Sequence, residues 1–204
     1  MKKLFYVVSA LAALTLLAPN VGFAQSADNQ LGIYGDEAGS LDSQNFVVAA
    51  STPFTAYMVL TNPVDNYDMA VGEVEAFECR VAFSNGAMVF KLAETLPPQA
   101  INVGDSSNPA AGLEYAVGLG VPTPVVGGAV TLVEFTFMVL AVSQIDVFIE
   151  ESQGGNLYYQ EADNKELVDY YPSSSDPAMP VASFNGTVTP VDEETWGGVK
   201  ALYR

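Results

Sequence analysis

The 204-residue chain carries 24 acidic residues against 7 basic ones, a net charge of −17, and it contains no histidine and one cysteine. This charge excludes nucleic acid as a partner, because proteins bind nucleic acid by replacing phosphate counterions with Lys and Arg. The missing histidine removes the usual general base of Ser and Cys hydrolases and the commonest ligand of zinc, copper and iron.

The first 24 residues have the three parts of a secretory signal peptide. Lys2 and Lys3 form a cationic start, an apolar run extends from Leu4 to Ala18, and Gly22-Phe23-Ala24 is a small-residue exit. The apolar run of about 15 residues is shorter than the roughly 20 that a membrane-spanning helix needs. We therefore predict a bacterial Sec-type signal peptide at residues 1–24, no transmembrane segment after its cleavage, and an extracellular, cell-surface or periplasmic location.

Apolar and polar residues alternate with a period of two along most of the remaining chain, which predicts β-strands. The clearest strands are Phe77–Phe83, Thr131–Leu140 and Ile145–Glu150, and we expect the last two to pair with each other. Asn85-Gly86 has the sequence of a type I′ turn and is expected to close a β-hairpin between Phe83 and Met88. Further strands are expected at Leu31–Tyr34, Asn45–Ala50, Phe54–Thr61, Met88–Ala93, Leu113–Leu119, Asn156–Tyr159 and Ala182–Thr187.

Short strands separated by Pro- and Gly-containing turns are typical of a sandwich of two sheets. We predict an all-β fold, an antiparallel jelly-roll or Ig-like β-sandwich of about nine strands, at residues 25–189. Within Phe77–Phe83, Cys79 shares the apolar face with Phe77 and Val81. We therefore predict that the Cys79 thiol is buried, and a lone cysteine excludes an internal disulfide.

After Pro190 the character of the sequence changes. An acidic linker leads into a C-terminal amphipathic tail, together residues 190–204, and the acids before the tail and bases near its end suit a short helix. The apolar side of this tail is formed by Trp196, Val199, Leu202 and Tyr203. Two interpretations stay open: the tail docks on its own sandwich and staples the terminus, or it is a tag recognised by a secretion, anchoring or assembly partner.

Three segments carry a resemblance to a known family: Phe54–Pro63 (FTAYMVLTNP), Val74–Phe83 (VEAFECRVAF) and Gly127–Val139 (GGAVTLVEFTFMV), followed by Ile145–Ile149. Their order and their residue patterns resemble the cohesin-type β-sandwich. Cohesins bind dockerin modules, and the wider superfamily includes carbohydrate-binding modules. The resemblance therefore implies a jelly-roll sandwich that binds protein or glycan, and it assigns no site.

A second resemblance concerns the two ends of the mature chain. The start Leu31–Asp36 (LGIYGD) and the tail Thr195–Arg204 (TWGGVKALYR) are similar to segments of uncharacterised exported bacterial proteins. This similarity implies export and adds no mechanism.

Acidic residues cluster in two loops that are candidates for calcium. Asp65 with Asp68, and Glu161 with Asp163, offer carboxylates that backbone carbonyls would have to complete to six to eight oxygen ligands. Neither loop follows the spaced Asp-x-Asp-x-Asp-Gly pattern, so the alternative is that these acids are solvated loop residues. No other cofactor is predicted.

Two adjacent pairs of tyrosines are candidates for a platform that stacks on sugar rings: Tyr158 with Tyr159, and Tyr170 with Tyr171. If the strand alternates, one ring of each pair must face outward. The alternative is ordinary packing against the core and its edges.

Together these features predict a non-enzymatic, exported β-sandwich that acts as a binding or assembly module, with a protein partner or a second copy as its ligand. The alternative is a carbohydrate-binding module that holds a polysaccharide on the exposed tyrosines. A glycosidase that uses two paired carboxylates is a more remote alternative, because the sequence does not show the separation that such a pair requires.

Overall fold

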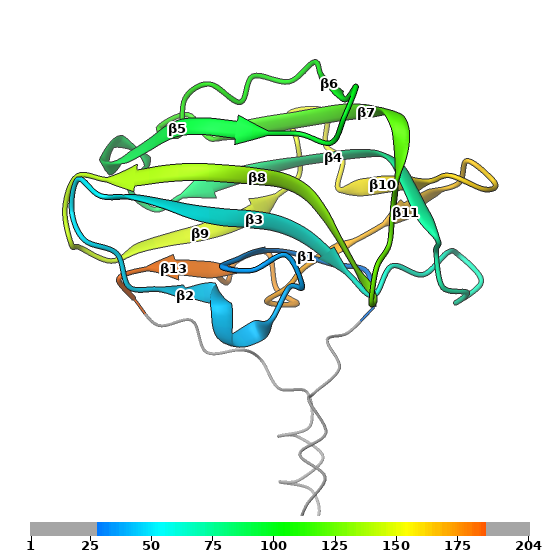
Figure 1. Ribbon diagram of the computed structural model, residues 1–204, viewed down its shortest axis with the longest axis horizontal. Coiled ribbons are helices and arrows are strands. Elements are labelled where there is room, and N and C mark those ends of the chain that lie inside the picture. The colour runs from blue at the N-terminus through cyan, green and yellow to red at the C-terminus, as the bar shows by residue number, and fades with distance from the viewer. Residues whose placement is uncertain (1–27, 187–204) are drawn as a thin grey trace, which may run out of the picture.

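The structure, a computed structural model, describes residues 28–186 as two β-sheets that face each other across one core (Figure 1). It contains thirteen strands and two short 3₁₀ helices, η1 (Leu41–Gln44) and η2 (Gly86–Met88), within that range. The prediction of an all-β sandwich is confirmed. The signal peptide predicted at residues 1–24 and the tail predicted at residues 190–204 lie outside the described residues. None of the helices in the described part is both long and apolar enough to span a bilayer.

The first sheet has five strands in the order β12-β1-β3-β8-β5. Their bounds are β12 (Tyr171–Pro172), β1 (Gln30–Tyr34), β3 (Pro53–Thr61), β8 (Ala129–Val139) and β5 (Val89–Thr95). All neighbours are antiparallel except β1 and β12, which are parallel. Register shifts interrupt the β3–β8 ladder at Met58/Val59 and the β5–β8 ladder at Lys91/Ala93.

The second sheet follows the order β11-β10-β4-β9-β13-β2, and β7 and β6 extend it from β4. Its strands are β11 (Leu167–Asp169), β10 (Tyr158–Glu161), β4 (Glu73–Phe83), β9 (Ile145–Glu150), β13 (Ala182–Phe184), β2 (Asn45–Phe46), β7 (Leu113–Pro124) and β6 (Ile101–Asn102). β4 pairs with β7 along nearly its whole length. Because a strand has two edges, β9 and β10 must share the other one.

This sharing creates a protrusion that positions the candidate site. On β4, Arg80 lies opposite Glu150 of β9, and Glu78 lies opposite Tyr158 of β10. Only Cys79 separates the two positions on β4, whereas residues 151–157 separate them on the other side. Residues 151–157, here called the 151–157 loop, therefore leave the ladder and rise beside the sheet.

The core is built from the inward-facing residues of both sheets and is rich in aromatic rings. Phe135 and Phe137 of β8 are stacked with ring centroids 4.8 Å apart, and Phe184 of β13 meets Phe54 of β3 edge to face at 5.0 Å. The second contact joins strands of opposite sheets. Alternation along β8 produces the first, because every second residue points to the same side of a strand.

Two pairing predictions are wrong. β8 and β9 do not pair with each other: β8 pairs with β3 and β5 in the first sheet, whereas β9 pairs with β4 and β13 in the second. Asn85-Gly86 does not close a hairpin either, because the chain crosses there from β4 of one sheet to β5 of the other. Asn85 has φ −143°, not the positive value that a type I′ turn demands, and it leads into η2.

Some strand lengths also differ from the prediction. The strand expected at Asn45–Ala50 is only Asn45–Phe46, and Val47 beyond it is almost fully exposed. The strands β6, β11 and β12, each of two or three residues, were not predicted. Segments this short complete too little of an alternation to be recognised in the sequence.

Cys79 is buried, as its register predicted. Its side chain is fully inaccessible to solvent, and its Sγ lies 3.8 Å from Met58 Sδ of the opposite sheet. Burial raises the pKa of the Cys79 thiol to about 12, since a thiolate is poorly solvated among apolar neighbours. The thiol is therefore protonated at neutral pH and shielded from reagents.

We predict that Cys79 in the folded protein resists iodoacetamide at pH 8 and reacts fully once the protein is denatured, because the thiolate is the reactive form. Mass spectrometry of the intact protein before and after unfolding in guanidinium measures this. Stoichiometric native alkylation within minutes would show that β4 has a different register.

Candidate functional site

The outward side of β4, β7 and β6 is here called the β4–β7 face. It consists of Ala76, Glu78 and Arg80 from β4 and Glu114, Ala116 and Gly118 from β7, with Ile101 and Val103 at the β6 edge. A Cβ placed on Gly118 would meet no atom within 4 Å. The small residues therefore leave the middle of the face low, and charged and apolar side chains rise around it.

Arg80 organises the charges of this face. Its Nε lies 3.1 Å from Glu114 Oε1, its Nη1 donates to Glu150 Oε2 at 2.5 Å, and its Nη2 donates to the carbonyl of Ala111 at 2.6 Å. The ladder explains this arrangement, because Arg80 lies opposite Glu114 on one neighbouring strand and opposite Glu150 on the other. One guanidinium thus serves two carboxylates.

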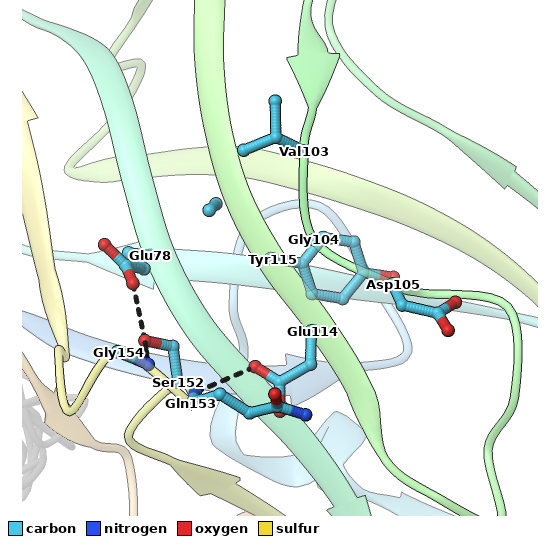
Figure 2. A pocket seen from close by; sticks show the side chains of 10 residues that line it. Glu78, Val103, Gly104, Asp105, Glu114, Tyr115, Ser152, Gln153 and Gly154 are labelled. Carbon is cyan, nitrogen blue, oxygen red and sulfur yellow. Dashed lines mark hydrogen bonds between the residues drawn. The ribbon is translucent and has the colours of Figure 1, made fainter.

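A pocket of about 250 Å³ lies at the edge of this face, between the 151–157 loop and the segment that follows β6 (Figure 2). Its lining residues are Glu78, Val103, Gly104, Asp105, Glu114, Tyr115, Ala116, Ser152, Gln153 and Gly154. Figure 2 shows that the loop brings Ser152 to Glu78 and Gln153 to Glu114, while the Asp105 carboxylate points away from both glutamates. The pocket thus has an acidic end at the loop and an apolar end at Val103 and Ala116.

Glu78 is held by neutral donors. Ser152 Oγ donates to its Oε1 at 2.5 Å, and Asn156 Nδ2 donates to its Oε2 at 3.2 Å. Desolvation raises the pKa of Glu78, but the hydrogen bonds from Ser152, Asn156 and Tyr158 outweigh it and leave the pKa below its ordinary value. Glu78 is therefore ionised at neutral pH.

Glu114 is the more buried of the two glutamates, with 8% of its surface exposed. Its Oε2 accepts one hydrogen bond, from the Gln153 backbone N–H at 3.2 Å, and its buried Oε1 accepts none although Arg80 Nε is near. An ionised carboxylate offers about four acceptor positions. Glu114 is thus sparsely hydrogen-bonded for a carboxylate at this depth.

A second polar cluster closes the sandwich behind the pocket. Glu94 of β5 accepts hydrogen bonds from Tyr115 Oη of β7 and from Ser106 Oγ, both at 2.8 Å, and it pairs with Lys91. These contacts connect the two sheets. They also fix the position of the segment after β6, which forms one wall of the pocket. Burial raises the pKa of Glu94, but the hydrogen bonds from Lys91, Ser106 and Tyr115 lower it below its ordinary value.

The predicted tyrosine platform needs correction. Tyr159 and Tyr170 are buried in the core, where their rings stack with centroids 6.3 Å apart. Their hydroxyls donate inside the protein, Tyr159 to the carbonyl of Val64 at 2.7 Å and Tyr170 to the carbonyl of Glu78 at 2.6 Å. These two rings are unavailable to a sugar. Only Tyr171, 59% exposed, and the half-buried Tyr158 remain, and they lie on different sheets.

The two acidic loops that are candidates for calcium lie side by side. Asn66 Nδ2 donates to Glu166 Oε2 at 3.2 Å and so joins them. Across residues 28–186, no three side chains of His, Cys, Asp or Glu gather where they could hold a metal ion.

The carboxylates of Asp65 and Glu161 serve their own loops instead. Asp65 Oδ1 accepts the backbone N–H groups of Tyr67 and Met69, both at 2.8 Å, and Glu161 Oε2 accepts that of Asp163 at 2.8 Å. Asp68 and Asp163 are exposed. The structure therefore favours the alternative of loop acids over a calcium site at these four residues.

The residues of the β4–β7 face were not singled out from the sequence. One signal was present: Glu78 and Arg80 occupy the polar side of a strand whose other side is apolar. The partners of these residues come from β7 and from the 151–157 loop, which are distant in the chain. The tail residues Trp196, Val199, Leu202 and Tyr203 lie outside the described residues.

We predict that Arg80→Gln lowers the free energy of unfolding by about 1–3 kcal/mol, because the nearly buried Glu114 would lose the guanidinium with which it pairs. Lys165→Gln is the matched control, since Lys165 pairs with Glu75 in a more exposed position. The control should cost about 0–1 kcal/mol. Urea denaturation of both variants measures the difference, and equal costs would contradict the role given to Arg80.

We also predict that Glu94 contributes to acid sensitivity. Its pKa is lower in the folded protein than in the unfolded chain, so its stabilising effect is complete above the ordinary pKa of 4.5 and is lost as the pH falls below that value. Glu94→Gln should therefore be less stable than the parent at pH 7 and show a smaller further loss of stability between pH 5 and pH 3. Urea titrations across that range test this, and parallel pH curves for the two proteins would refute it.

Comparisons with known proteins bear on the fold. No protein-family model matches the sequence, and the search of curated proteins finds no significant relative. Among solved structures, the chain is similar to a type II cohesin domain from the cellulosome of Acetivibrio cellulolyticus, with 11% identity and a TM-score of 0.51 over 78% of this chain and 96% of that one.

It is also similar to the second type II cohesin module of the cellulosomal adaptor ScaA scaffoldin of the same organism. That match has 11% identity and a TM-score of 0.50 over 78% of this chain and 98% of the module. A structure of the same module with its long C-terminal linker gives a TM-score of 0.50 over 84% of this chain and 97% of that one. At such identity the similarity concerns the fold, and this chain therefore has a cohesin-like β-sandwich fold.

Proposed function

We propose that this chain is an exported, non-catalytic binding module that engages a protein partner through its β4–β7 face. The observation that carries the proposal is the shape of this face. A low centre of small residues is flanked by exposed Ile101 and Val103 on one side and by the 151–157 loop on the other. Apolar side chains exposed beside a hollow of this kind are typical of an interaction surface.

The fold supports the same proposal. The similar structures are cohesin modules, two of them from a cellulosomal adaptor scaffoldin. A partner protein or a second copy of the chain fits this architecture better than an enzyme substrate. Glu78 accepts hydrogen bonds from its neighbours and has a lowered pKa, the opposite of what a general acid needs.

Export is part of the proposal. A signal peptide at residues 1–24 would carry the module out of the cytoplasm, to the cell surface, the periplasm or the medium. Once there, the tail at residues 190–204 would act as a second and separate recognition element through Trp196, Val199, Leu202 and Tyr203. The β4–β7 face and the tail would then link two different components.

We predict that Gly118→Tyr weakens partner binding without unfolding the protein. The new ring would stand in open space at the centre of the face, and Tyr is favoured in strands. Gly72→Tyr is the matched control, because a Cβ at Gly72 also meets nothing within 4 Å and Gly72 lies outside the face.

The partner would be captured from the exported proteins of the source bacterium on the immobilised mature protein, purified, and titrated by calorimetry. We expect Gly118→Tyr to weaken the affinity at least about tenfold, a loss of about 1.4 kcal/mol, and the control to bind normally. Unchanged binding to Gly118→Tyr would move the site off this face. Retention of the mature protein on insoluble polysaccharide, with no protein partner captured, would favour the carbohydrate-binding alternative. A parallel capture with protein that lacks residues 195–204 distinguishes partners of the β4–β7 face from partners of the tail.

A further inference from the structure

The pocket beside the β4–β7 face combines negative charge with an apolar wall. Glu78 and Glu114 contribute the charge, and both carboxylates face the hollow from neighbouring strands (Figure 2). Ala116 forms the floor next to Glu78, and Val103, 81% exposed, forms the far wall. The two ends of the pocket therefore suit two different parts of one ligand.

Each basic side chain in the described part of the chain already belongs to an ion pair. Three basic side chains occur between residues 28 and 186, and each forms an ion pair: Arg80 with Glu114 and Glu150, Lys91 with Glu94, and Lys165 with Glu75. Within residues 28–186, none of these ion pairs includes Glu78. The charge on Glu78 is thus stabilised by neutral donors only, and a cation from outside would find it uncompensated.

Glu114 provides an independent indication that the pocket is incomplete. Glu114 as a residue is 8% exposed, and its buried Oε1 accepts no hydrogen bond, while its Oε2 accepts one, from Gln153 N–H at 3.2 Å. It also shares Arg80 with Glu150. Buried carboxylates are normally well supplied with donors, because leaving an acceptor unsatisfied costs free energy. A ligand that brings N–H donors would correct this deficit.

We propose that the pocket binds a lysine side chain of the partner protein, with its ammonium between Glu78 and Glu114 and its aliphatic stem across Ala116 and Val103. This inference rests on the proposed function and specifies the chemistry of its partner. Lysine fits the two ends of the pocket because it joins a four-carbon apolar stem to a compact positive charge with three hydrogen-bond donors.

The arrangement of the two carboxylates favours lysine over arginine. Glu78 lies opposite Ala116, two ladder positions from the Arg80–Glu114 pair, so the two glutamates are diagonal neighbours on the same side of β4 and β7. Diagonal positions of this kind are about 7–8 Å apart at Cα. An arginine could form a bidentate pair with only one of these carboxylates, and Glu114 already faces Nε of Arg80, whereas a compact ammonium between the two carboxylates has donors for both.

The experiment uses Nα-acetyl-lysine N-methylamide as the probe and Nα-acetyl-norleucine N-methylamide as its uncharged counterpart. Each is titrated into the ¹⁵N-labelled mature protein while amide shifts are followed by NMR. We expect the lysine probe to shift the amides of Val103, Ala116, Gln153 and Gly154 in a saturable way, and more salt should weaken it. The norleucine probe should bind at least about tenfold more weakly, because one charge-assisted contact corresponds to about that factor.

Variants separate the charge from the shape of the pocket. Glu78→Gln should weaken the lysine probe about tenfold, and Ala116→Leu should also block it by filling the apolar end while leaving every charge in place. The control is Glu134→Gln, which removes the same charge from β8 on the opposite sheet. An unchanged amide spectrum outside the pocket shows that each variant is folded.

Several results would overturn the inference. They are equal binding of lysine and norleucine, equal or tighter binding of Nα-acetyl-arginine N-methylamide, or equal weakening by Glu78→Gln and Glu134→Gln. These failures are distinct from failure of the proposed function. If Gly118→Tyr weakens partner binding as expected while the lysine probe does not bind, the face is a protein-binding surface and the pocket is not its lysine site.

Discussion

The structure depends on the hydrogen bonding of one strand, β4, along both of its edges. β7 occupies one edge, and β9 and β10 occupy the other in succession. Since β9 and β10 are consecutive in the chain, the residues between them must leave the sheet opposite Cys79. The same pairing that completes the sheet therefore produces the 151–157 loop, and the loop delivers Ser152 and Gln153 to the two glutamates of the pocket.

The inward side of β4 makes this arrangement rigid. Cys79 contacts Met58 of the opposite sheet, and Tyr170, whose hydroxyl bonds to the Glu78 carbonyl, lies stacked on Tyr159. Each of these side chains is buried, so a shift of β4 would expose apolar surface and break buried hydrogen bonds together. A rigid strand is a suitable base for a recognition surface, because little conformational entropy remains to be lost on binding.

Charge sets the chemistry of the outer surface. The described chain has few cations, and they neutralise particular glutamates at positions fixed by the ladder, as Arg80 does between Glu114 and Glu150. Other acidic residues, including Glu78, form no ion pair within the described residues, so their negative charge remains available to an approaching molecule. A surface of this kind repels other acidic proteins and attracts basic groups, and in the proposed binding function this charge would contribute specificity and association rate more than affinity.

The sequence by itself determined the sheet faces and thus the fold class. Alternation along Phe77–Phe83 placed Cys79 inward and Glu78 and Arg80 outward, and alternation along β8 gave the aromatic core. It did not determine strand partners: β8 and β9 proved to belong to different sheets, and Asn85-Gly86 proved to be a crossing between sheets. Period-two alternation shows which side of a strand is buried but carries no information about its neighbour. Only the tertiary structure decided that Tyr159 and Tyr170 are internal and that Glu78, Glu114 and Ser152 meet, because contacts between strands distant in the chain depend on how all the strands pack at once.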